Sequence, residues 1–388
     1  MLIERVDLRH FRNYGELSFD PDPGVNIFFG QNGSGKTNFL EAIHYCSLGK
    51  SHRVSQDQNS VMIGQREASC ALSVTGLHGR NEIEVRLCPG ESAVKSVWIN
   101  RKKAGRLSEM MGLLRCVIFS PEDLNLIKEG PSVRRKFLDM MISQISRPYF
   151  IALQKYRIAY NQRSAILRQA RQERTAPDPM VQDFESGMAE QAELICRERE
   201  KYVSLLSRAV EEIYGQISGR PAEILRISYA PSIRDRERLR DAFQALLEKS
   251  REDDMRRGTT ESGPHRDDLN IQLNQQNMKV YASQGQIRSA SLSLKLAQCG
   301  LFHQLTGEYP VLLLDDVMSE LDLSRRNNLL SLLRGMQTFI TCSDEGDLAG
   351  CGDFETFRVS AVEGQARIRR ARGEISVRPV IFTEPDFS

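Results

Sequence analysis

The sequence predicts an α/β fold in which residues 1–120 and 260–388 build one domain, around a mainly helical insertion over residues 121–259. Two observations lead to this prediction. Apolar β-rich segments occur near both ends of the chain, whereas helical periodicity fills the middle. A glycine-rich loop near the N-terminus also needs an acidic strand end as its partner, and a buried apolar run near the C-terminus ends in two acids, so the two ends of the chain should meet.

Composition indicates a globular protein of two or three domains. The chain has 388 residues, of which 40% are apolar and 27% charged, and the formal net charge is only +2. A nucleic-acid partner would therefore have to be bound by a locally basic surface. The eight cysteines form no CxxC pair, so we expect neither structural zinc nor a disulfide framework. The charged N-terminus is unlike a signal peptide and no run of 18 apolar residues occurs, so we expect a cytoplasmic protein without membrane contact.

The strand predictions rest on short β-rich runs bounded by turn residues. In the first 120 residues, strands are expected to alternate with helices, the clearest helix covering residues 36–48. The continuous apolar run 311–314 is typical of a parallel strand buried on both faces, and a helix is expected over 287–301 before it. The expected strands are 25–29, 69–74, 82–87, 94–99, 116–119, 311–314 and 338–341.

The middle of the chain has the pattern of an antiparallel helical hairpin. One helix is expected over 149–174 and a second over 181–215, whose apolar residues recur at intervals of three, four or seven. Two prolines, Pro177 and Pro179, end the first helix. At 1.5 Å per residue the arm would be roughly 40–50 Å long. The mixed-charge segment 234–257 is interpreted as a helix with a solvated face.

The glycine-rich loop carries the clearest chemistry. It matches GxxxxGK[ST] in full, between a β-rich run and a helix pattern. Glycines let the backbone approach phosphate oxygens, and the following helix adds its positive N-terminal end. We expect this loop to bind ATP, with Lys36 neutralising the β- and γ-phosphates and Thr37 offering its hydroxyl to Mg²⁺. Its residues are Gly30, Gln31, Asn32, Gly33, Ser34, Gly35, Lys36 and Thr37.

Two acidic residues follow the buried run 311–314. Ligand sites of parallel sheets lie at the carboxyl ends of strands. Asp315 is therefore expected to hold Mg²⁺, directly or through water, and Asp316 to orient or deprotonate an attacking water. An Asp pair can also simply cap the next helix, and that alternative stays open.

The segment Ser283-Gln284-Gly285-Gln286 is a weaker signal. A polar turn with a glycine before a helix is most often only a helix start. The segment lies about 30 residues before the acidic strand, and this order suggests the signature motif of ABC-type ATPases.

Several segments, taken in order, resemble the RecF family of bacterial recombination and gap-repair proteins over essentially the whole chain. Residues 7–14 (DLRHFRNY) resemble the start of RecF and SMC-type proteins, and residues 121–139 resemble a first family signature. Residues 263–269 (GPHRDDL) resemble a further family segment, and residues 313–325 a second signature. One such match could arise by chance, whereas all of them in order are specific.

The resemblance implies an ABC-type P-loop ATPase head related to SMC proteins, in which two heads sandwich two ATP molecules. Ser283, Gly285 and Gln286 of one head would then meet the γ-phosphate held by the partner's loop, with Ser283 acting in catalysis. Arg12 and Asn13 would lie close to the nucleotide.

The resemblance also implies a function in DNA repair. The protein would form an ATP-dependent homodimer on DNA, at single-strand gaps beside duplex. There it would work with RecR and RecO to help load RecA, supporting replication restart and the SOS response.

The chain departs from the family pattern at three positions, two of which bear on the expected rate. Cys342 stands at the switch position, where many ABC-type ATPases carry His, and Asp316 replaces the usual Glu. Glu129 stands where a Gly is expected in the first signature. The missing His and the shorter acid lead us to expect slow turnover, in which hydrolysis acts as a timer.

A basic stretch marks the expected DNA surface. Between residues 131 and 175, ten Lys or Arg stand against two acids, so the stretch carries +8. Phosphate contacts without a base-reading motif should tolerate sequence and weaken with salt. The alternative is an ordinary solvated charged face. The residues expected to share one helix face are Arg157, Asn161, Ser164, Arg168 and Arg171, with the three arginines contacting DNA.

Other function classes fit parts of the pattern. A nucleotide-driven transport subunit would need a membrane-coupling surface, and a metabolic phosphotransferase would not need a signature motif acting in trans. A generic SMC- or ABC-like ATPase subunit coupled to another partner is the nearest alternative. The residues of the compact segment 265–268 (HRDD) lie too close together to converge on a metal, so a structural or interface role is expected.

Overall fold

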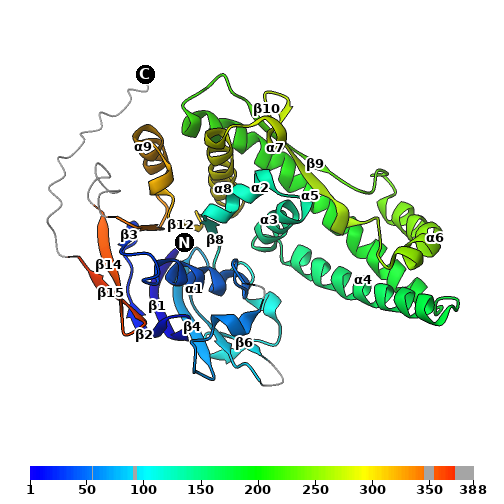
Figure 1. Ribbon diagram of the computed structural model, residues 1–388, viewed down its shortest axis with the longest axis horizontal. Coiled ribbons are helices and arrows are strands. Elements are labelled where there is room, and N and C mark those ends of the chain that lie inside the picture. The colour runs from blue at the N-terminus through cyan, green and yellow to red at the C-terminus, as the bar shows by residue number, and fades with distance from the viewer. Residues whose placement is uncertain (55, 91–93, 345–353, 372–388) are drawn as a thin grey trace. The chain divides into compact units, whose positions relative to one another are not determined.

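The computed structural model describes the chain except for residues 55, 91–93, 345–353 and 372–388 (Figure 1). The chain divides into two compact units. Unit 1 contains Met1–Asp123, Gln216–Gly219 and Phe302–Ser388, and unit 2 contains Leu124–Gly215 and Arg220–Leu301.

A six-stranded sheet in unit 1 joins the two ends of the chain. In order across the sheet, its strands are β15 (Gln365–Arg370), β14 (Glu355–Val362), β3 (Val25–Phe29), β13 (Thr338–Cys342), β12 (Val311–Asp315) and β8 (Cys116–Phe119). All neighbouring pairs are parallel except β14 with β15. Every residue of β12 and β13 is buried, as continuous apolar sequences require of strands covered on both faces.

The second sheet of unit 1 is antiparallel. In order, its strands are β2 (Tyr14–Phe19), β1 (Leu2–Phe11), β4 (Ala68–Gly76), β5 (Gly79–Leu87), β6 (Lys95–Ile99) and β7 (Lys102–Lys103). Helix α1 (Lys36–Leu48) contacts strands of both sheets, so it lies in the core of the unit. The ring of Phe39 on α1 packs 4.9 Å from Phe28 of β3, between ring centroids. A further helix, α9 (Leu323–Leu332), is capped by Asp322, whose side chain accepts a hydrogen bond from the Arg325 amide.

Unit 2 is mainly helical with a small antiparallel sheet. Its helices are α2 (Asn125–Lys128), α3 (Pro131–Ser143), α4 (Arg147–Glu173), α5 (Val181–Ser218), α6 (Leu239–Arg257), α7 (Met278–Tyr281) and α8 (Gln284–Thr306), the last residues of α5 and α8 belonging to unit 1. Its sheet has the order β11 (Gln276–Asn277), β10 (Asp268–Leu273) and β9 (Leu225–Ala230). Short 3₁₀ helices in the two units cover Asp57–Ser60, Leu107–Glu109, Pro121–Leu124, Pro264–Arg266 and Met318–Glu320.

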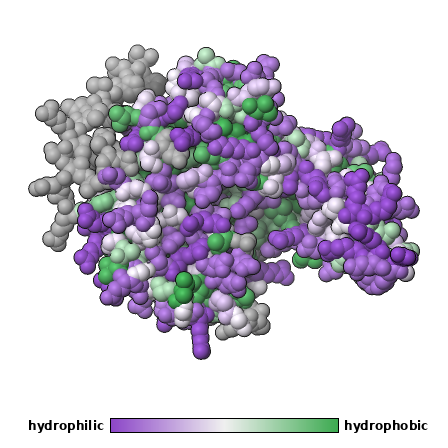
Figure 2. Space-filling view, viewed as in Figure 1, coloured by the Kyte–Doolittle hydropathy of each residue, from purple (hydrophilic) through white to green (hydrophobic). Residues whose placement is uncertain are grey.

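Helices α4 and α5 form the expected antiparallel hairpin. Near the start of α4, Arg199 donates to the Tyr149 hydroxyl at 3.0 Å, and further along Arg163 donates to Glu185 at 3.0 Å. Residue numbers therefore rise along α4 as they fall along α5. In Figure 2 hydrophilic side chains cover most of the visible surface around the far end of this hairpin and α6.

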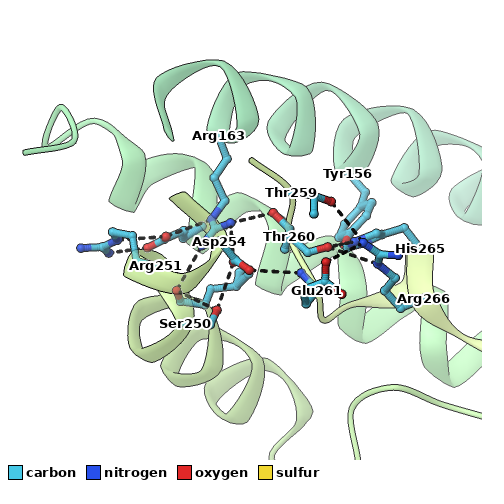
Figure 3. Close-up of polar contacts among 12 residues, drawn as sticks. Tyr156, Arg163, Ser250, Arg251, Asp254, Thr259, Thr260, Glu261, His265 and Arg266 are labelled. Carbon is cyan, nitrogen blue, oxygen red and sulfur yellow. Dashed lines mark hydrogen bonds and ion pairs between the residues drawn. The ribbon is translucent and has the colours of Figure 1, made fainter. Parts of the chain in front are cut away.

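A buried ion network ties α4 to α5 and α6. Arg163 is fully buried, and its guanidinium donates to Glu185 at 3.0 Å, to Asp254 at 2.9 Å and to the Thr260 hydroxyl at 2.6 Å. Figure 3 shows Arg163 pointing from α4 toward Asp254 and Thr260. Arg251 of α6 also donates to Glu185, so two arginines and two acids balance each other in the core of unit 2.

The segment 265–268 makes structural contacts in unit 2, as the sequence predicts. Nδ1 of His265 lies 2.6 Å from the Tyr156 hydroxyl, and burial lowers the pKa of the His265 imidazole. Buried Asp267 accepts from Arg199 at 2.8 Å, and Asp268 accepts from Arg134 at 2.7 Å.

The structure differs from the sequence-based expectations in three places. Among the described residues of 1–120, eight strands accompany a single α-helix, because short antiparallel turns rather than helical crossovers link the second sheet. Helix α6 is more than a solvated face, since it buries Leu239, Phe243 and Leu247. The expected domain boundary lies near residue 260, whereas unit 2 continues to Leu301 because β10 pairs with β9. The division into a head and an insertion stays a prediction.

Candidate functional site

The glycine-rich loop connects β3 to α1 in unit 1. Gly30 and Gly35 have positive φ angles of 154° and 116°. A Cβ at Gly30 would clash with the carbonyl oxygen of Val359, and one at Gly35 would lie 2.6 Å from the Cβ of Ala366. Only glycine fits both positions, because β14 and β15 approach the loop backbone closely. Gly35 caps α1, so the N-terminal amides of that helix face the loop.

Lys36 and Ser34 give the loop the polar groups that a phosphate needs. Lys36 is 7% exposed, and its Nζ donates to the carbonyl oxygens of Gly30 at 2.5 Å and Gln31 at 3.0 Å. Burial lowers the pKa of Lys36, while the nearby carboxylates of Asp316 and Asp315 act in the opposite direction. The Ser34 hydroxyl is buried and has no hydrogen-bond partner among the described residues. A cation and an unused hydroxyl in one amide-rich loop fit the anionic oxygens of a triphosphate.

Thr37 and Asp315, the two residues expected to bind Mg²⁺, are in direct contact although 278 positions separate them in the sequence. The Thr37 hydroxyl donates to Oδ1 of Asp315 at 2.9 Å, and the Thr341 hydroxyl donates to the same oxygen at 2.6 Å. Burial raises the pKa of Asp315, while the two hydroxyl bonds partly offset that shift. A hydroxyl and a buried carboxylate are hard oxygen donors, which fits Mg²⁺ bound together with phosphate oxygens. Such an ion would neutralise charge that develops on those oxygens.

Asp316 lies beside the loop in a constrained backbone conformation. Its φ is 52°, and its amide donates to the Thr341 hydroxyl at 2.9 Å. Ser343 Oγ lies 2.9 Å from Oδ1 of Asn32 and 3.5 Å from Oδ1 of Asp316. This serine therefore connects the phosphate loop to the expected water-activating acid. Neither Asp315 nor Asp316 is the N-cap of α9, which is Asp322.

Arg12 and Asn13 both contact the elements that carry the loop. Arg12 donates to Glu41 of α1 at 2.7 Å, and Glu41 is fully buried. The Asn13 amide donates to the Ser34 carbonyl at 3.4 Å, and its oxygen accepts from Asn38 at 2.9 Å. The expected pair thus lies next to the loop, with Arg12 held by an acid one turn into α1.

The segment 283–286 begins α8 in unit 2. The Ser283 amide donates to Oε1 of Gln286 at 2.9 Å, and the Gln286 amide donates to the Ser283 hydroxyl at 3.3 Å. This reciprocal pair is a capping box, so both side chains have a structural role at the helix start. Gln286 also donates to Glu223 at 3.1 Å, and Ser283 is exposed. A role of Ser283, Gly285 and Gln286 toward a partner's nucleotide stays a prediction.

Comparison with known proteins decides the family. The family described as "RecF/RecN/SMC N terminal domain" matches residues 2–366. DNA replication and repair protein RecF of Lactobacillus johnsonii is 41% identical over 355 residues, covering 89% of this chain and 93% of that protein. The same-named protein of Clostridium perfringens (strain SM101 / Type A) is 37% identical over 361 residues, covering 92% and 98%. The chain belongs to the RecF family.

Solved structures agree with the RecF assignment. The structure of "the recombination mediator protein RecF-ATPrS in RecFOR pathway" is 33% identical, with a TM-score of 0.85, and covers 95% of this chain and 98% of that one. The structure of an SMC head bound to the C-winged helix domain of ScpA has a TM-score of 0.57 at 17% identity, so that likeness concerns the fold alone. The α/β fold is therefore that of the ABC-type heads of RecF and SMC proteins. In the described part of the chain, no helix is long and apolar enough to cross a membrane.

The basic face expected on α4 of this RecF-family chain needs correction. Arg157, Arg168 and Arg171 are exposed, but Ser164 is only 9% exposed and faces the interior. Two of the ten cations counted in the stretch are buried in ion pairs, Arg163 with Glu185 and Asp254, and Arg134 with Asp268. The positive charge at the surface is therefore smaller than the sequence count, because acids from other elements fold against α4 and α3. The DNA role of the three arginines stays a prediction.

Three polar residues at the nucleotide site escaped the sequence reasoning. Glu41 pairs with Arg12, Thr341 donates to Asp315, and the Ser343 hydroxyl lies between Asn32 and Asp316. The acid Glu41 within an otherwise apolar stretch of helix was one available signal. The second available signal was position in the sheet. Thr341 and Ser343 lie at or just after the carboxyl end of β13, beside the acidic end of β12.

Proposed function

We propose that this chain is an ATP-dependent DNA-binding protein of recombinational repair. Two copies would close on DNA with ATP and Mg²⁺ between them, at single-strand gaps beside duplex. By analogy with the RecF relatives, it would work with RecR and RecO to help load RecA, with consequences for replication restart and the SOS response. ATP hydrolysis would open the dimer.

The main observation behind the proposal is the hydrogen bond between the Thr37 hydroxyl and the Asp315 carboxylate. Chance matches to a glycine-rich loop lack a buried acid at the Mg²⁺ position, whereas here the hydroxyl and the carboxylate are 2.9 Å apart. Lys36 and the α1 N-terminus would bind the triphosphate, and Asp316 would orient the attacking water. The solved structures of RecF-ATP and RecF-ATPrS support the choice of nucleotide.

Replacement of Lys36 by Met tests the proposal. The variant should lose ATP affinity and ATP-dependent assembly on gapped DNA, because the buried ammonium that neutralises the phosphates is gone. A matched control is Lys103→Met, since Lys103 is exposed on β7 of the same unit. Nucleotide binding is measured with a fluorescent ATP analogue, and assembly by sizing with and without ATP and gapped duplex. A Lys36→Met protein that still assembled on DNA in response to ATP would contradict the proposal.

Turnover should be slow, so that hydrolysis serves as a timer. The shorter acid Asp316 and the buried thiol of Cys342, at the position where a switch His is common, motivate this expectation. A steady-state rate of tens per second per head, with or without DNA, would contradict it. A generic SMC- or ABC-like ATPase subunit is the alternative function, and ATPase activity indifferent to DNA would favour it.

A further inference from the structure

One face of the β14–β15 hairpin packs against the phosphate loop. The backbone of Val359 in β14 excludes a side chain at Gly30, and Ala366 of β15 does the same at Gly35. The Ala366 amide also donates to the Asn13 carbonyl at 2.8 Å. The hairpin therefore packs against both ends of the loop, through the Val359 carbonyl at Gly30 and the Ala366 side chain at Gly35.

The opposite face of the hairpin carries arginines. Strand register places Arg358 opposite Arg369 and Ser360 opposite Arg367, so these side chains share one face. All three arginines are exposed, whereas the alternate residues Phe357, Val359 and Ala366 are buried. The hairpin lies at the edge of the sheet, with β15 as the edge strand (Figure 1).

The arginines of this face have no acidic partner in the part of the chain that the structure describes. Glu355 pairs with Arg370 at 3.2 Å, and among the described residues no carboxylate pairs with Arg358, Arg367 or Arg369. The guanidinium of Arg358 lies 5.5 Å from the ring centroid of Phe29, which holds it along the sheet. Like charges directly opposite each other destabilise an antiparallel pair. Arg358 and Arg369 therefore lower the stability of the hairpin unless an anion binds between or beside them.

We propose that Arg358, Arg367 and Arg369 form a contact surface for the phosphate backbone of DNA, and that the contact acts on ATP hydrolysis through the phosphate loop. The inference rests on the proposed function and adds a surface and a route of regulation to it. A polyanion supplies the missing counter-charges. No exposed aromatic residue accompanies the three arginines on this face, so the contact would be with phosphates and indifferent to sequence.

A purely protective role is the competing explanation for these residues. Charged side chains on an edge strand prevent strand-to-strand association between molecules. That role needs charge on β15, but it gives no reason for an arginine of β14 directly opposite one of β15. The two explanations also make different predictions. Only a DNA contact predicts that the arginines change the salt dependence of DNA affinity and the stimulation of ATPase activity by DNA.

The test replaces the three arginines by Gln in the full-length protein. Because three phosphate contacts are lost, the slope of log affinity against log salt should become about 2.7 less steep for duplex DNA. If the affinities are equal at 1 M salt, this slope difference corresponds to a roughly 500-fold loss of affinity at 0.1 M salt. Stimulation of ATPase activity by DNA should be lost, while the activity without DNA stays at the wild-type value.

Two matched variants separate charge from structure. Arg358→Lys/Arg367→Lys/Arg369→Lys keeps the charge and should keep both the salt slope and the stimulation. Arg5→Gln/Arg80→Gln/Arg101→Gln removes three exposed arginines of unit 1 that have acidic partners, and should leave DNA binding unchanged. Thermal unfolding of each variant shows whether it is folded.

The outcomes distinguish this inference from the proposed function. Suppose that wild-type protein binds DNA and that the Gln variant shows the same salt slope of DNA affinity and the same stimulation of ATPase activity by DNA. The proposed DNA contact on the hairpin is then wrong, and the proposed function stands. The same holds if the Gln variant only aggregates more, or loses affinity for a protein partner instead of DNA. If wild-type protein binds no DNA with or without ATP, the proposed function itself fails.

Discussion

Ser343 contacts two parts of the nucleotide site for which we propose different tasks. Its hydroxyl contacts Asn32 in the phosphate loop and Asp316 at the end of β12, at 2.9 and 3.5 Å. Cys342, which the family resemblance leads us to expect at the switch position, is instead fully buried in β13. Ser343, the first polar side chain after this strand, therefore contacts Asp316 from the phosphate-loop side, while Ser319 contacts the same carboxylate oxygen at 3.4 Å.

Replacement of Ser343 by Ala should lower kcat for ATP hydrolysis on the order of 10-fold, because a small misplacement of a water-orienting acid slows the chemical step. KM for ATP should change little, since Lys36 and the loop amides still bind the phosphates. Ser343→Thr restores the hydroxyl and should restore much of the rate. An unchanged kcat, or a raised KM with kcat unchanged, would show that Ser343 does not position Asp316.

At the scale of elements, α4 depends on buried charge rather than on apolar contacts alone. Arg163 lies among Glu185 of α5, Asp254 of α6 and Thr260, and all three nitrogens of its guanidinium donate hydrogen bonds. Burial of three charged groups is tolerated because each has a partner. The network therefore fixes the position of α6 against the hairpin.

Replacement of Arg163 by Met should destabilise unit 2 by about 3–5 kcal/mol, because it leaves Glu185 and Asp254 short of a buried counter-charge. The exposed Arg168→Met on the same helix is the control and should cost less than about 0.5 kcal/mol. Thermal or urea unfolding measures both. The double change Arg163→Met/Asp254→Leu should recover part of the loss, and a loss no larger than that of the control would show that the ion network contributes little.

The elements that were predicted correctly are those whose function or burial is determined by a short contiguous stretch of sequence. Contiguous residues make the phosphate loop, and a continuous apolar run makes β12, so both occur at the predicted positions. Arg163 counts among the ten cations of the basic stretch, and its burial was not predicted because its acidic partners lie on other helices, which periodicity within α4 does not reveal. The strands β14 and β15 were missed, since their alternation is short and their partner β3 lies more than 300 residues away.

At the scale of the whole molecule, the proposed dimer needs residues from both copies at each nucleotide. The loop of one copy supplies Lys36 and Thr37, and Ser283 of the other copy would complete the phosphate contacts. Ser283 also caps α8, so its removal would weaken the helix start as well. Ser283→Asp separates the two roles, because Asp is an equally good N-cap but places a negative charge against the γ-phosphate.

A mixing experiment then tests whether the site is shared. Lys36→Met and Ser283→Asp should each abolish most of the ATPase activity alone. In a mixed dimer, the Ser283→Asp copy contributes an intact loop and the Lys36→Met copy an intact Ser283, so one of the two sites is complete. Equimolar mixing should therefore restore activity, with about half of the dimers mixed if pairing is random. If each copy uses its own Ser283, no mixture regains activity, and the shared site is excluded.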